Sequence, residues 1–235
     1  MWSLTLSTHD LSPVIWRRIF NEFLHEIRGA TATLAEIYAG LEADRAAMDY
    51  KTGSISYSSG IALYALTRKI DPTTVFEVGT FIGRSAAAMA IAMDAGEPRD
   101  RLLQTCDLSN DFVMNTRRFK TKVQGMPKTG STAALKAAIT AGRPVDLFHF
   151  DGRLQPADLE MVTALSHERT AVALDDFEGV EKGVINGMLL KQTPKFAGHF
   201  LVEPPSPEVL GPLGYTDRCL TALLIPPSSF RLAPQ

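Results

Sequence analysis

The sequence predicts an α/β fold in which a doubly wound, mostly parallel sheet of seven strands follows N-terminal helices and includes an antiparallel C-terminal strand. β-forming runs alternate with helical segments through the middle of the chain, which is typical of parallel sheets with helical crossovers. The last two β-forming runs have no crossover helix between them, so they should pair antiparallel. With 235 residues, 45% of them hydrophobic, we expect a single domain over 1–235, with a helical arm or lid at 1–50 and a ligand-binding core at 51–235.

Two amphipathic helices are predicted at the N-terminus. Ser12 and Pro13 fit an N-cap followed by the first helical position, and apolar residues then recur every four positions over a first helix at about 13–28. A second helix is expected from Thr31 to about Met48. The pair could form a lid or a dimerisation arm, or could only cover an edge of the sheet, and the sequence leaves these interpretations open.

A polar loop at Lys51–Ser59 precedes a helix predicted at Gly60–Lys69, which Ser58 or Ser59 can cap. This helix leads directly into the first strand. We therefore expect the loop and the N-terminal helices to close over a ligand at the end of that strand and to exclude water.

The stretch at 71–93 is the centre of the predicted fold. An apolar strand ends at Glu77, a turn runs from Gly79 to Gly83, and an Ala-rich helix begins at Ser85. Glycines let the backbone approach a ligand closely, and the helix N-terminus offers unpaired N–H groups. Because open α/β sheets bind ligands at the carboxyl ends of their strands, the charge of Glu77 favours a cationic ligand over a pyrophosphate. The alternative is a buried turn whose glycines only permit tight packing.

The second strand, Arg101–Asp107, also ends in an acid. At this position of a nucleoside-binding sheet, a carboxylate typically accepts hydrogen bonds from ribose hydroxyls. Alternatively, Asp107 caps a following helix, with Asn110 or Asp111 sharing that role.

A short third strand at Thr121–Met126 is followed by a helix at Ala133–Ala141 with Gly142 as its C-cap. Ser131 and Thr132 open this helix. Their hydroxyls should lie near the same ligand-binding edge.

Four further strands are expected, at 144–151, 169–176, 199–203 and 219–225. Acidic residues end the first two of them. Asp151 ends the first of these and Asp175 and Asp176 end the second, so three carboxylates should meet at one edge. Their mutual repulsion favours a bound cation, and oxygen ligands suit Mg²⁺. Alternatively, Asp151 ends a turn and Asp176 caps a helix near Val180–Lys191.

The pattern E-x-G-x-x-x-G-x-S, from Glu77 to Ser85, resembles motif I of the class I S-adenosylmethionine-dependent methyltransferases. It lacks the G-x-G core of the dinucleotide fingerprint and the Lys-Ser/Thr end of a phosphate-binding loop. The resemblance implies a Rossmann-like, cofactor-binding core. Its implied S-adenosylmethionine-binding residues are Glu77, Gly79, Gly83, Ser85 and Asp107, with Ser131 or Thr132 near the adenine.

The acids resemble a second, more specific pattern. FHFDGR, with Asp151, and ALDDFEGVEKG, with Asp175 and Asp176, are similar to the Mg²⁺ ligands of the catechol-type and bacterial macrolide-sugar O-methyltransferases. This resemblance implies that the three acids bind Mg²⁺ or a similar divalent cation and that Asp151 is catalytic. Leu154 stands where those families carry a lysine or histidine, so the usual general base is missing. His149 could replace it, or could be a packed core residue.

The predicted function is therefore methyl transfer from S-adenosylmethionine to an oxygen of a small hydroxylated metabolite with vicinal oxygens. A catalytically silent cofactor-binding or scaffolding protein of the same fold is the alternative, supported by the missing base. A nicotinamide oxidoreductase is disfavoured by Glu77 and by the glycine spacing.

Charge and composition predict a small-molecule partner. The net charge of −2 gives no reason to expect binding to nucleic acid or to an anionic membrane, and no apolar run reaches the roughly 18 residues of a membrane span. Cys106 and Cys219 show no metal-ligand or redox spacing, and no signal peptide is evident, so we expect a cytoplasmic protein. The identity of the acceptor and a homo-oligomeric state are left open.

Overall fold

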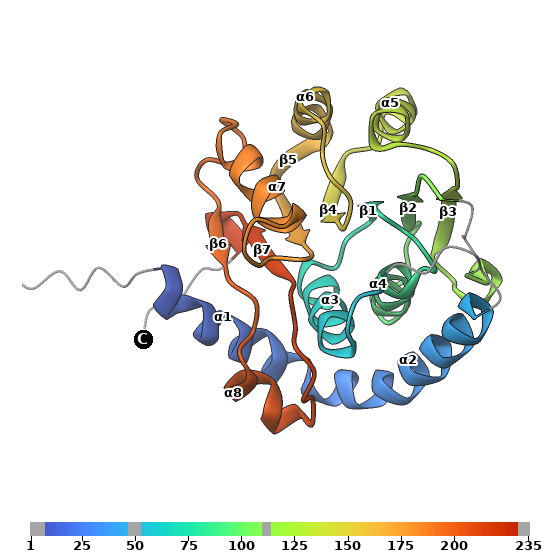
Figure 1. Ribbon diagram of the computed structural model, residues 1–235, viewed down its shortest axis with the longest axis vertical. Helices are drawn as coiled ribbons and strands as arrows, with labels where there is room; N and C mark the ends of the chain where they lie inside the picture. The colour runs from blue at the N-terminus through green and yellow to red at the C-terminus, as the bar shows by residue number, and fades with distance from the viewer. Residues whose placement is uncertain (1–7, 47–52, 110–113, 230–235) are drawn as a thin grey trace, which may run out of the picture.

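The computed structural model describes residues 8–46, 53–109 and 114–229. Its centre is a seven-stranded sheet in the order β3-β2-β1-β4-β5-β7-β6 (Figure 1). The strands are β1 (Thr74–Val78), β2 (Leu102–Cys106), β3 (Lys122–Met126), β4 (Val145–Phe150), β5 (Ser166–Leu174), β6 (Phe200–Val202) and β7 (Ala222–Ile225). Strands β1 to β5 pair parallel to one another, and β7 runs antiparallel to both β5 and β6. The predicted fold class is confirmed.

Helices cover both faces of the sheet (Figure 1). They are α1 (Thr8–Glu22), α2 (Leu24–Arg45), α3 (Tyr57–Ile70), α4 (Arg84–Asp94), α5 (Ser131–Ala141), α6 (Pro156–Leu165), α7 (Lys182–Lys191) and the short α8 (Pro207–Leu210). Helices α3 and α4 lie on one face, with α1 and α2 as an outer layer beyond them, whereas α5 and α6 lie on the opposite face. Among the described residues, no helix is both long and apolar enough to cross a membrane.

The core has two parts, one on each face of the sheet. Phe76, Phe148 and Phe150 pack toward α5 and α6, while Val75 and Leu147 pack toward α3 and α4. Alternate residues of a strand point to opposite faces. Because helices cover both faces, apolar residues of β4 point to both of them, as is typical of a central parallel strand.

The N-terminal helices differ from the prediction in both boundaries. Helix α1 begins at Thr8 instead of Pro13, and the break between the helices falls at Phe23 instead of near Gly29. Ser12 lies inside α1 and is not its N-cap; its hydroxyl accepts a hydrogen bond from the backbone N–H of Glu203. Thr31 lies inside α2, where its hydroxyl donates to the carbonyl of Ile27.

Helix α3 also starts earlier than expected. Its N-cap is Ser56, whose hydroxyl accepts from the backbone N–H of Ser59 at 3.0 Å. Ser58 and Ser59 therefore lie inside the helix, where both are buried and bind the segment that precedes β7. A later helix, α6, had not been predicted, although Gln155 and Asp158 form a capping box at its start.

The outer helices are packed onto the domain. The indole of Trp16, in α1, is fully buried and donates to the carbonyl of Glu203 at 2.7 Å. At the other end, Arg45 of α2 lies over the ring of Phe81, in the turn that follows β1. The N-terminal arm thus covers α3 and α4 and reaches the turn that follows β1. Closure over a ligand stays a prediction, because residues 47–52 and the predicted helix end at Met48 lie outside the described residues.

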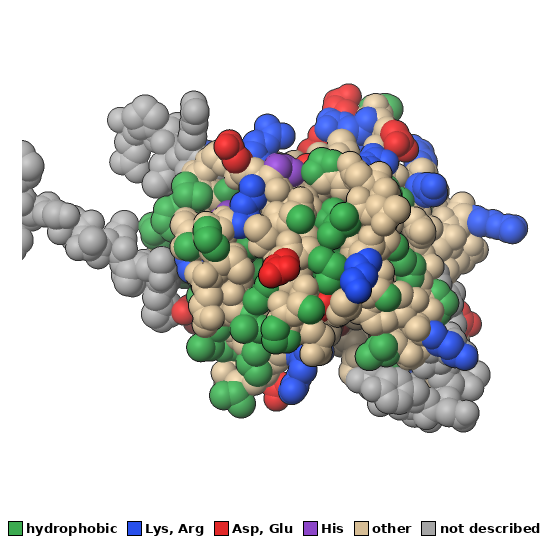
Figure 2. Space-filling view, turned by 90° about the horizontal axis from the view of Figure 1, so that it is seen from above, with side chains coloured by type: hydrophobic (Ala, Val, Ile, Leu, Met, Phe, Trp, Pro, Cys, Tyr) green, Lys and Arg blue, Asp and Glu red, His purple; other side chains and the backbone are tan. Residues whose placement is uncertain are grey.

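The face built by α5 and α6 is seen in Figure 2, where Lys and Arg side chains are scattered among hydrophobic and acidic ones. This mixture agrees with the balanced composition of 24 basic and 26 acidic residues.

Candidate active site

The glycine turn after β1 is in close contact with the loop after β4. Gly79 has φ +99°, and a Cβ atom there would lie 2.7 Å from the carbonyl carbon of Asp151. Gly83 has φ +91°, and a Cβ atom there would lie 3.0 Å from the side chain of Met114. Both positions favour glycine by conformation as well as by space. The turn therefore sets the distance between the first and fourth strand ends, the two places where the sequence predicts ligand-binding groups.

Asp107 holds this turn in shape. Its Oδ2 accepts from the backbone N–H of Phe81 at 2.7 Å, and its Oδ1 accepts from the N–H of Ser109 at 2.7 Å. Phe81 has φ +43°, an unusual conformation for a residue with a large side chain. Each carboxylate oxygen retains a second lone pair for a hydroxyl donor. Asp107 can thus brace the turn and bind a ribose at the same time.

A cavity of about 600 Å³ opens beside the turn and extends to the end of β4. The described residues that line it include Gly79, Asp107, Ser131, Thr132 and Asp151, but not Glu77, Gly83 or Ser85. The cavity thus brings together four of the seven predicted cofactor-binding positions and the first predicted metal ligand.

The hydroxyls of Ser131 and Thr132 bind the carboxylate of Asp158, each at 2.6 Å. Asp158 is fully buried and belongs to α6. These hydroxyls therefore join the starts of α5 and α6. A contact of either residue with adenine stays a prediction.

Glu77 lies beneath the turn with no exposed surface. Its carboxylate accepts from the hydroxyl of Thr105 and pairs with Nδ1 of His149 at 2.9 Å. Burial alone would lower the pKa of His149, but the hydrogen bond to Glu77 and its negative charge outweigh burial and raise that pKa. Direct binding of a cofactor by Glu77 stays a prediction.

His149 is fully buried and does not line the cavity, so its ring is not an accessible base there. Its Nε2 has no hydrogen-bond partner among the described residues. The structure thus favours the interpretation of His149 as a core residue that pairs with Glu77.

The three predicted metal ligands come together at the ends of β4 and β5. One carboxylate oxygen from each of Asp151, Asp175 and Asp176 lies within 4.8 Å of the others. Asp176 has φ +51°, a left-handed conformation that Asp tolerates better than most residues. The hydroxyl of Thr221 donates to Asp175 at 2.9 Å. We refer to these three residues as the acid cluster.

Burial is the main cause that raises the pKa of both Asp151 and Asp175. For Asp151, the neighbouring charge of Asp175 adds to this effect. Such a cluster is stabilised by a cation.

A cation from the chain itself lies in the cluster. The ammonium of Lys182 is 2.7 Å from Oδ1 of Asp151 and 2.8 Å from Oδ2 of Asp176. Burial alone would lower the pKa of Lys182, but the charges and hydrogen bonds of Asp151 and Asp176 together outweigh burial and raise that pKa. No motif in the sequence predicts this role for Lys182. Its only signal is the Lys-Gly pair at the start of the helix that follows the adjacent acids.

Gly183 explains how Lys182 reaches the cluster. A Cβ atom at Gly183 would lie 2.1 Å from the carbonyl oxygen of Asp175, so the first turn of α7 packs directly on the acid-bearing loop. By contrast, Leu154 turns into the core, with 5% of its surface exposed, and its N–H donates to Asn186. The position where the families named above carry a lysine or histidine base is thus occupied in this chain by a buried leucine.

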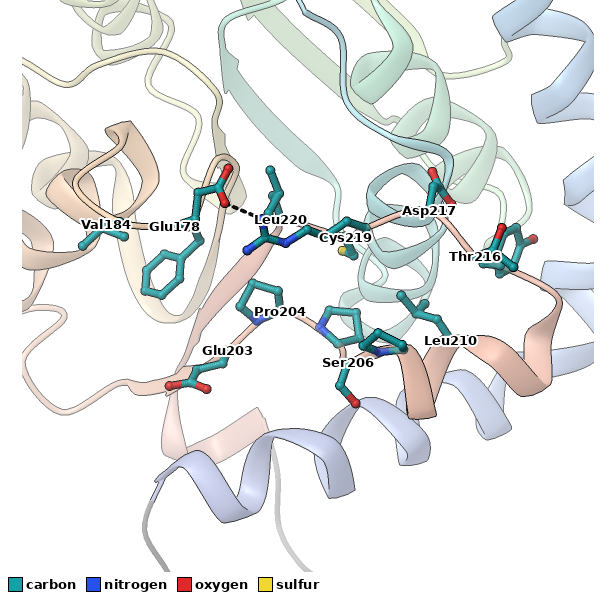
Figure 3. A pocket seen from close by; sticks show the side chains of 16 residues that line it. Glu178, Val184, Glu203, Pro204, Ser206, Leu210, Thr216, Asp217, Cys219 and Leu220 are labelled. Carbon is teal, nitrogen blue, oxygen red and sulfur yellow. Dashed lines mark hydrogen bonds and ion pairs between the residues drawn. The ribbon is translucent and has the colours of Figure 1, made fainter.

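A second cavity, of about 590 Å³, begins immediately after Asp176. Its wall is formed by the loop at Phe177–Gly179 and by the proline-rich segment between β6 and β7 (Figure 3). Glu178 pairs with Arg218 at 2.5 Å between the two sides, as the dashed line in Figure 3 marks. Asp217 binds the N–H and hydroxyl of Ser58, which fixes this segment to the start of α3.

Comparisons with known proteins agree on the fold. No protein-family model matches the chain, and no curated protein matches it in sequence. An O-methyltransferase from Bacillus cereus in complex with SAH is similar in structure, with 17% identity, a TM-score of 0.57, and coverage of 83% of this chain and 90% of that chain. TomG, an O-methyltransferase from Streptomyces achromogenes involved in tomaymycin synthesis, was solved in complex with SAM; it has 18% identity, a TM-score of 0.56, and coverage of 84% and 89%.

The calicheamicin methyltransferase CalS11 is also similar, with 16% identity, a TM-score of 0.51, and coverage of 71% of this chain and 77% of that chain. At these identities the comparisons concern the fold. The strand order, the glycine turn and the solved structures together show that this chain has the fold of the class I S-adenosylmethionine-dependent O-methyltransferases.

Proposed function

We propose that the protein transfers a methyl group from S-adenosylmethionine to an oxygen of a small hydroxylated metabolite. The observation that carries this proposal is the acid cluster at the end of a cavity that begins at the glycine turn, with a second cavity lined by the residues that follow Asp176. One cavity reaches from the glycine turn to Asp151 and Lys182, and the other begins at Phe177, next to Asp176. A donor in the first cavity and an acceptor in the second would meet at the cluster.

The residues of the first cavity fit a nucleoside with a cationic sulfonium. Gly79 lines the cavity without a side chain, Asp107 offers carboxylate lone pairs to ribose hydroxyls, and the acid cluster supplies negative charge at the far end. S-adenosylmethionine, when bound, supplies an electrophilic methyl group. The chain's contribution is to hold donor and acceptor in line and to exclude water.

The acid cluster also fits a hard divalent cation. Three carboxylates that converge within 4.8 Å form the all-oxygen donor set that Mg²⁺ prefers. Asp151, Asp175 and Asp176 would hold it. A bound divalent cation lowers the pKa of a coordinated hydroxyl and stabilises the oxyanion. This is the basis for proposing an acceptor with two vicinal oxygens, since such a group can complete the coordination.

The second cavity suggests the remaining shape of the acceptor. Its wall includes Phe177, Pro204, Pro205 and Leu210, which suit an apolar ring system, with Glu178 and Arg218 at one side. We therefore propose that the acceptor joins a vicinal pair of oxygens to an apolar or cyclic scaffold.

A catalytically silent cofactor-binding protein remains the second candidate. It is favoured by the burial of Leu154 and His149, which leaves neither the usual base position nor this histidine accessible to an acceptor. The two candidates differ in product formation, because both would bind S-adenosylmethionine.

The direct test is incubation with S-adenosylmethionine, Mg²⁺ and pooled phenols, enols and hydroxylated sugars. An enzyme should yield S-adenosylhomocysteine and one product heavier by about 14 Da, the mass of one CH₂, after attack by an activated hydroxyl. EDTA and Asp151→Ala should each abolish turnover, and Asp176→Asn should reduce it while keeping an oxygen ligand. Cofactor binding with no product from any pool would favour the silent protein, and absence of cofactor binding would contradict both.

A further inference from the structure

The ammonium of Lys182 and a metal ion would compete for the same two carboxylates. Nζ lies 2.7 Å from Asp151 and 2.8 Å from Asp176, both of which contribute oxygens to the acid cluster. Mg²⁺ binds oxygen at about 2.1 Å, so an ion on these oxygens would lie no more than about 5 Å from Nζ. Two cations at that distance in a partly buried site repel each other strongly.

Backbone packing keeps Lys182 in this position. It is the first residue of α7, and Gly183 lets that helix touch the acid-bearing loop. The Lys182 side chain is 26% exposed and that of Asp151 is 18% exposed, so the pair is shielded more than an ordinary surface ion pair. The ammonium contacts two carboxylates at once, which makes both hydrogen bonds charge-assisted.

One ammonium does not balance three carboxylates. Asp175 accepts instead from the neutral hydroxyl of Thr221. The cluster therefore retains negative charge while Lys182 is bound, and a divalent ion with additional oxygen ligands can still be attracted to it.

Resting on the proposed function of this edge, we propose that Lys182 is the resident counter-ion of the acid cluster and that a divalent metal ion binds by displacing its ammonium from Asp151 and Asp176. Lys182 is then a positioning residue. It holds the carboxylates together before the metal ion binds and sets the metal affinity of the free protein. Tight metal binding would need the extra oxygens of the acceptor.

The test measures metal binding alone, with neither cofactor nor acceptor present. Isothermal titration with MgCl₂ compares the full-length protein with Lys182→Gln, Lys182→Arg and the control Lys136→Gln, which removes an equal charge from an exposed position of α5. We expect Lys182→Gln to bind Mg²⁺ on the order of ten- to a hundredfold more tightly than the wild type. Lys182→Arg and Lys136→Gln should bind it no more tightly than the wild type.

Thermal unfolding gives a second readout. EDTA should leave the melting temperature of the wild type unchanged, whereas Lys182→Gln should melt lower in EDTA and recover in Mg²⁺ but not in NaCl of equal ionic strength. If Lys182→Gln fails to fold in EDTA, its refolding on addition of Mg²⁺ replaces the titration. Failure of Mg²⁺ to rescue it would overturn the proposal.

Equal or weaker Mg²⁺ binding by Lys182→Gln would also overturn the proposal. The same experiments distinguish failure of this proposal from failure of the proposed function. If Lys182→Gln binds Mg²⁺ tightly but the wild type transfers no methyl group, the counter-ion role stands and the proposed function fails. If the wild type transfers a methyl group but binds Mg²⁺ as tightly as Lys182→Gln, the proposed function stands and the counter-ion role fails.

Discussion

The two halves of the sheet's carboxyl edge stabilise their acidic side chains in different ways. In the half at β1 and β2, Asp107 accepts hydrogen bonds from the backbone N–H groups of Phe81 and Ser109. In the half at β4 and β5, Asp151 and Asp176 instead bind the ammonium of Lys182. Both arrangements give the carboxylates hydrogen-bond donors, but the two kinds of hydrogen-bond donor differ in whether they can move away.

A backbone N–H is fixed by the fold, whereas a lysine side chain can leave. The half at Asp107 is therefore a preorganised cradle whose acid shapes a turn. The half at the acid cluster can exchange one cation for another without unfolding. We therefore expect the half at Asp107 to be rigid and the half at the acid cluster to respond to what it binds.

The largest effect is expected where the two halves touch, at Gly79. Gly79→Ala places a methyl group 2.7 Å from the carbonyl carbon of Asp151 in a backbone conformation with φ +99°. We expect the free energy of unfolding to fall by roughly 3 kcal/mol or more, with loss of cofactor affinity. Urea unfolding and titration with S-adenosylmethionine measure the two effects.

The matched control is Gly142→Ala. Gly142 also has positive φ, +68°, but a Cβ atom there meets nothing within 4 Å, so the cost should be only about 1 kcal/mol. Equal losses in the two variants would show that contact with Asp151 does not matter.

Gly183→Ala tests the acid-cluster half. Its Cβ atom would lie 2.1 Å from the carbonyl oxygen of Asp175, so we expect destabilisation by about 1–3 kcal/mol although alanine is the better helix former. Gly29→Ala, in α2, meets nothing within 4 Å and should stabilise the protein by up to about 1 kcal/mol. Urea unfolding of both variants should give changes of opposite sign. A stabilised Gly183→Ala would mean that α7 can move away from the cluster freely.

Asp107→Ala tests the cradle half by ligand affinity. Removal of the carboxylate should weaken S-adenosylmethionine binding by about ten- to a hundredfold, as measured by calorimetry. Asp94→Ala is the control, because Asp94 accepts from the backbone N–H groups of Lys120 and Thr121 without lining the cavity. That variant should lose stability and keep its affinity. Unchanged affinity in a folded Asp107→Ala would disprove the ribose contact.

The smallest effect is expected at the amino-terminal end of β4, at Asp146. Burial by itself would raise the pKa of Asp146, but hydrogen bonds from Thr74 and Thr73 outweigh it and lower that pKa. A carboxyl group with a lowered folded pKa stabilises the protein above its unfolded pKa of about 3.9, and this contribution disappears as the pH falls through the folded pKa. Asp146→Asn should therefore cost about 1 kcal/mol at pH 7 and less at pH 3.

Urea unfolding of the wild type and Asp146→Asn at both pH values measures this difference. If the difference in free energy of unfolding between the two proteins widens from pH 7 to pH 3, another group controls the stability in acid. The comparison also separates an acid that is held by backbone N–H groups far from the site from Asp107, which is held in a similar way inside it.

Much of the site could be predicted because it is local in sequence. The turn at Gly79–Gly83 connects consecutive elements, and parallel strands place Asp107, Asp151 and Asp175 at one edge by topology alone. Helix boundaries were less predictable. Ser12 and Ser58 look like caps, but their hydroxyls bind Glu203 and Asp217, which are more than 150 positions away in the sequence. Such partners leave no local signal.

The sequence by itself determined the strand–turn–helix core, the position of the acids at the carboxyl ends of parallel strands, and the antiparallel C-terminal strand. These features could be predicted because hydrophobic periodicity and glycine conformation act over a few residues. Only the tertiary structure decided which groups those acids contact. It buries Glu77 against His149, commits Ser131 and Thr132 to Asp158, and brings Lys182 into the acid cluster. These pairings depend on how closely helices and loops pack, and that distance is set by contacts between segments far apart in the chain.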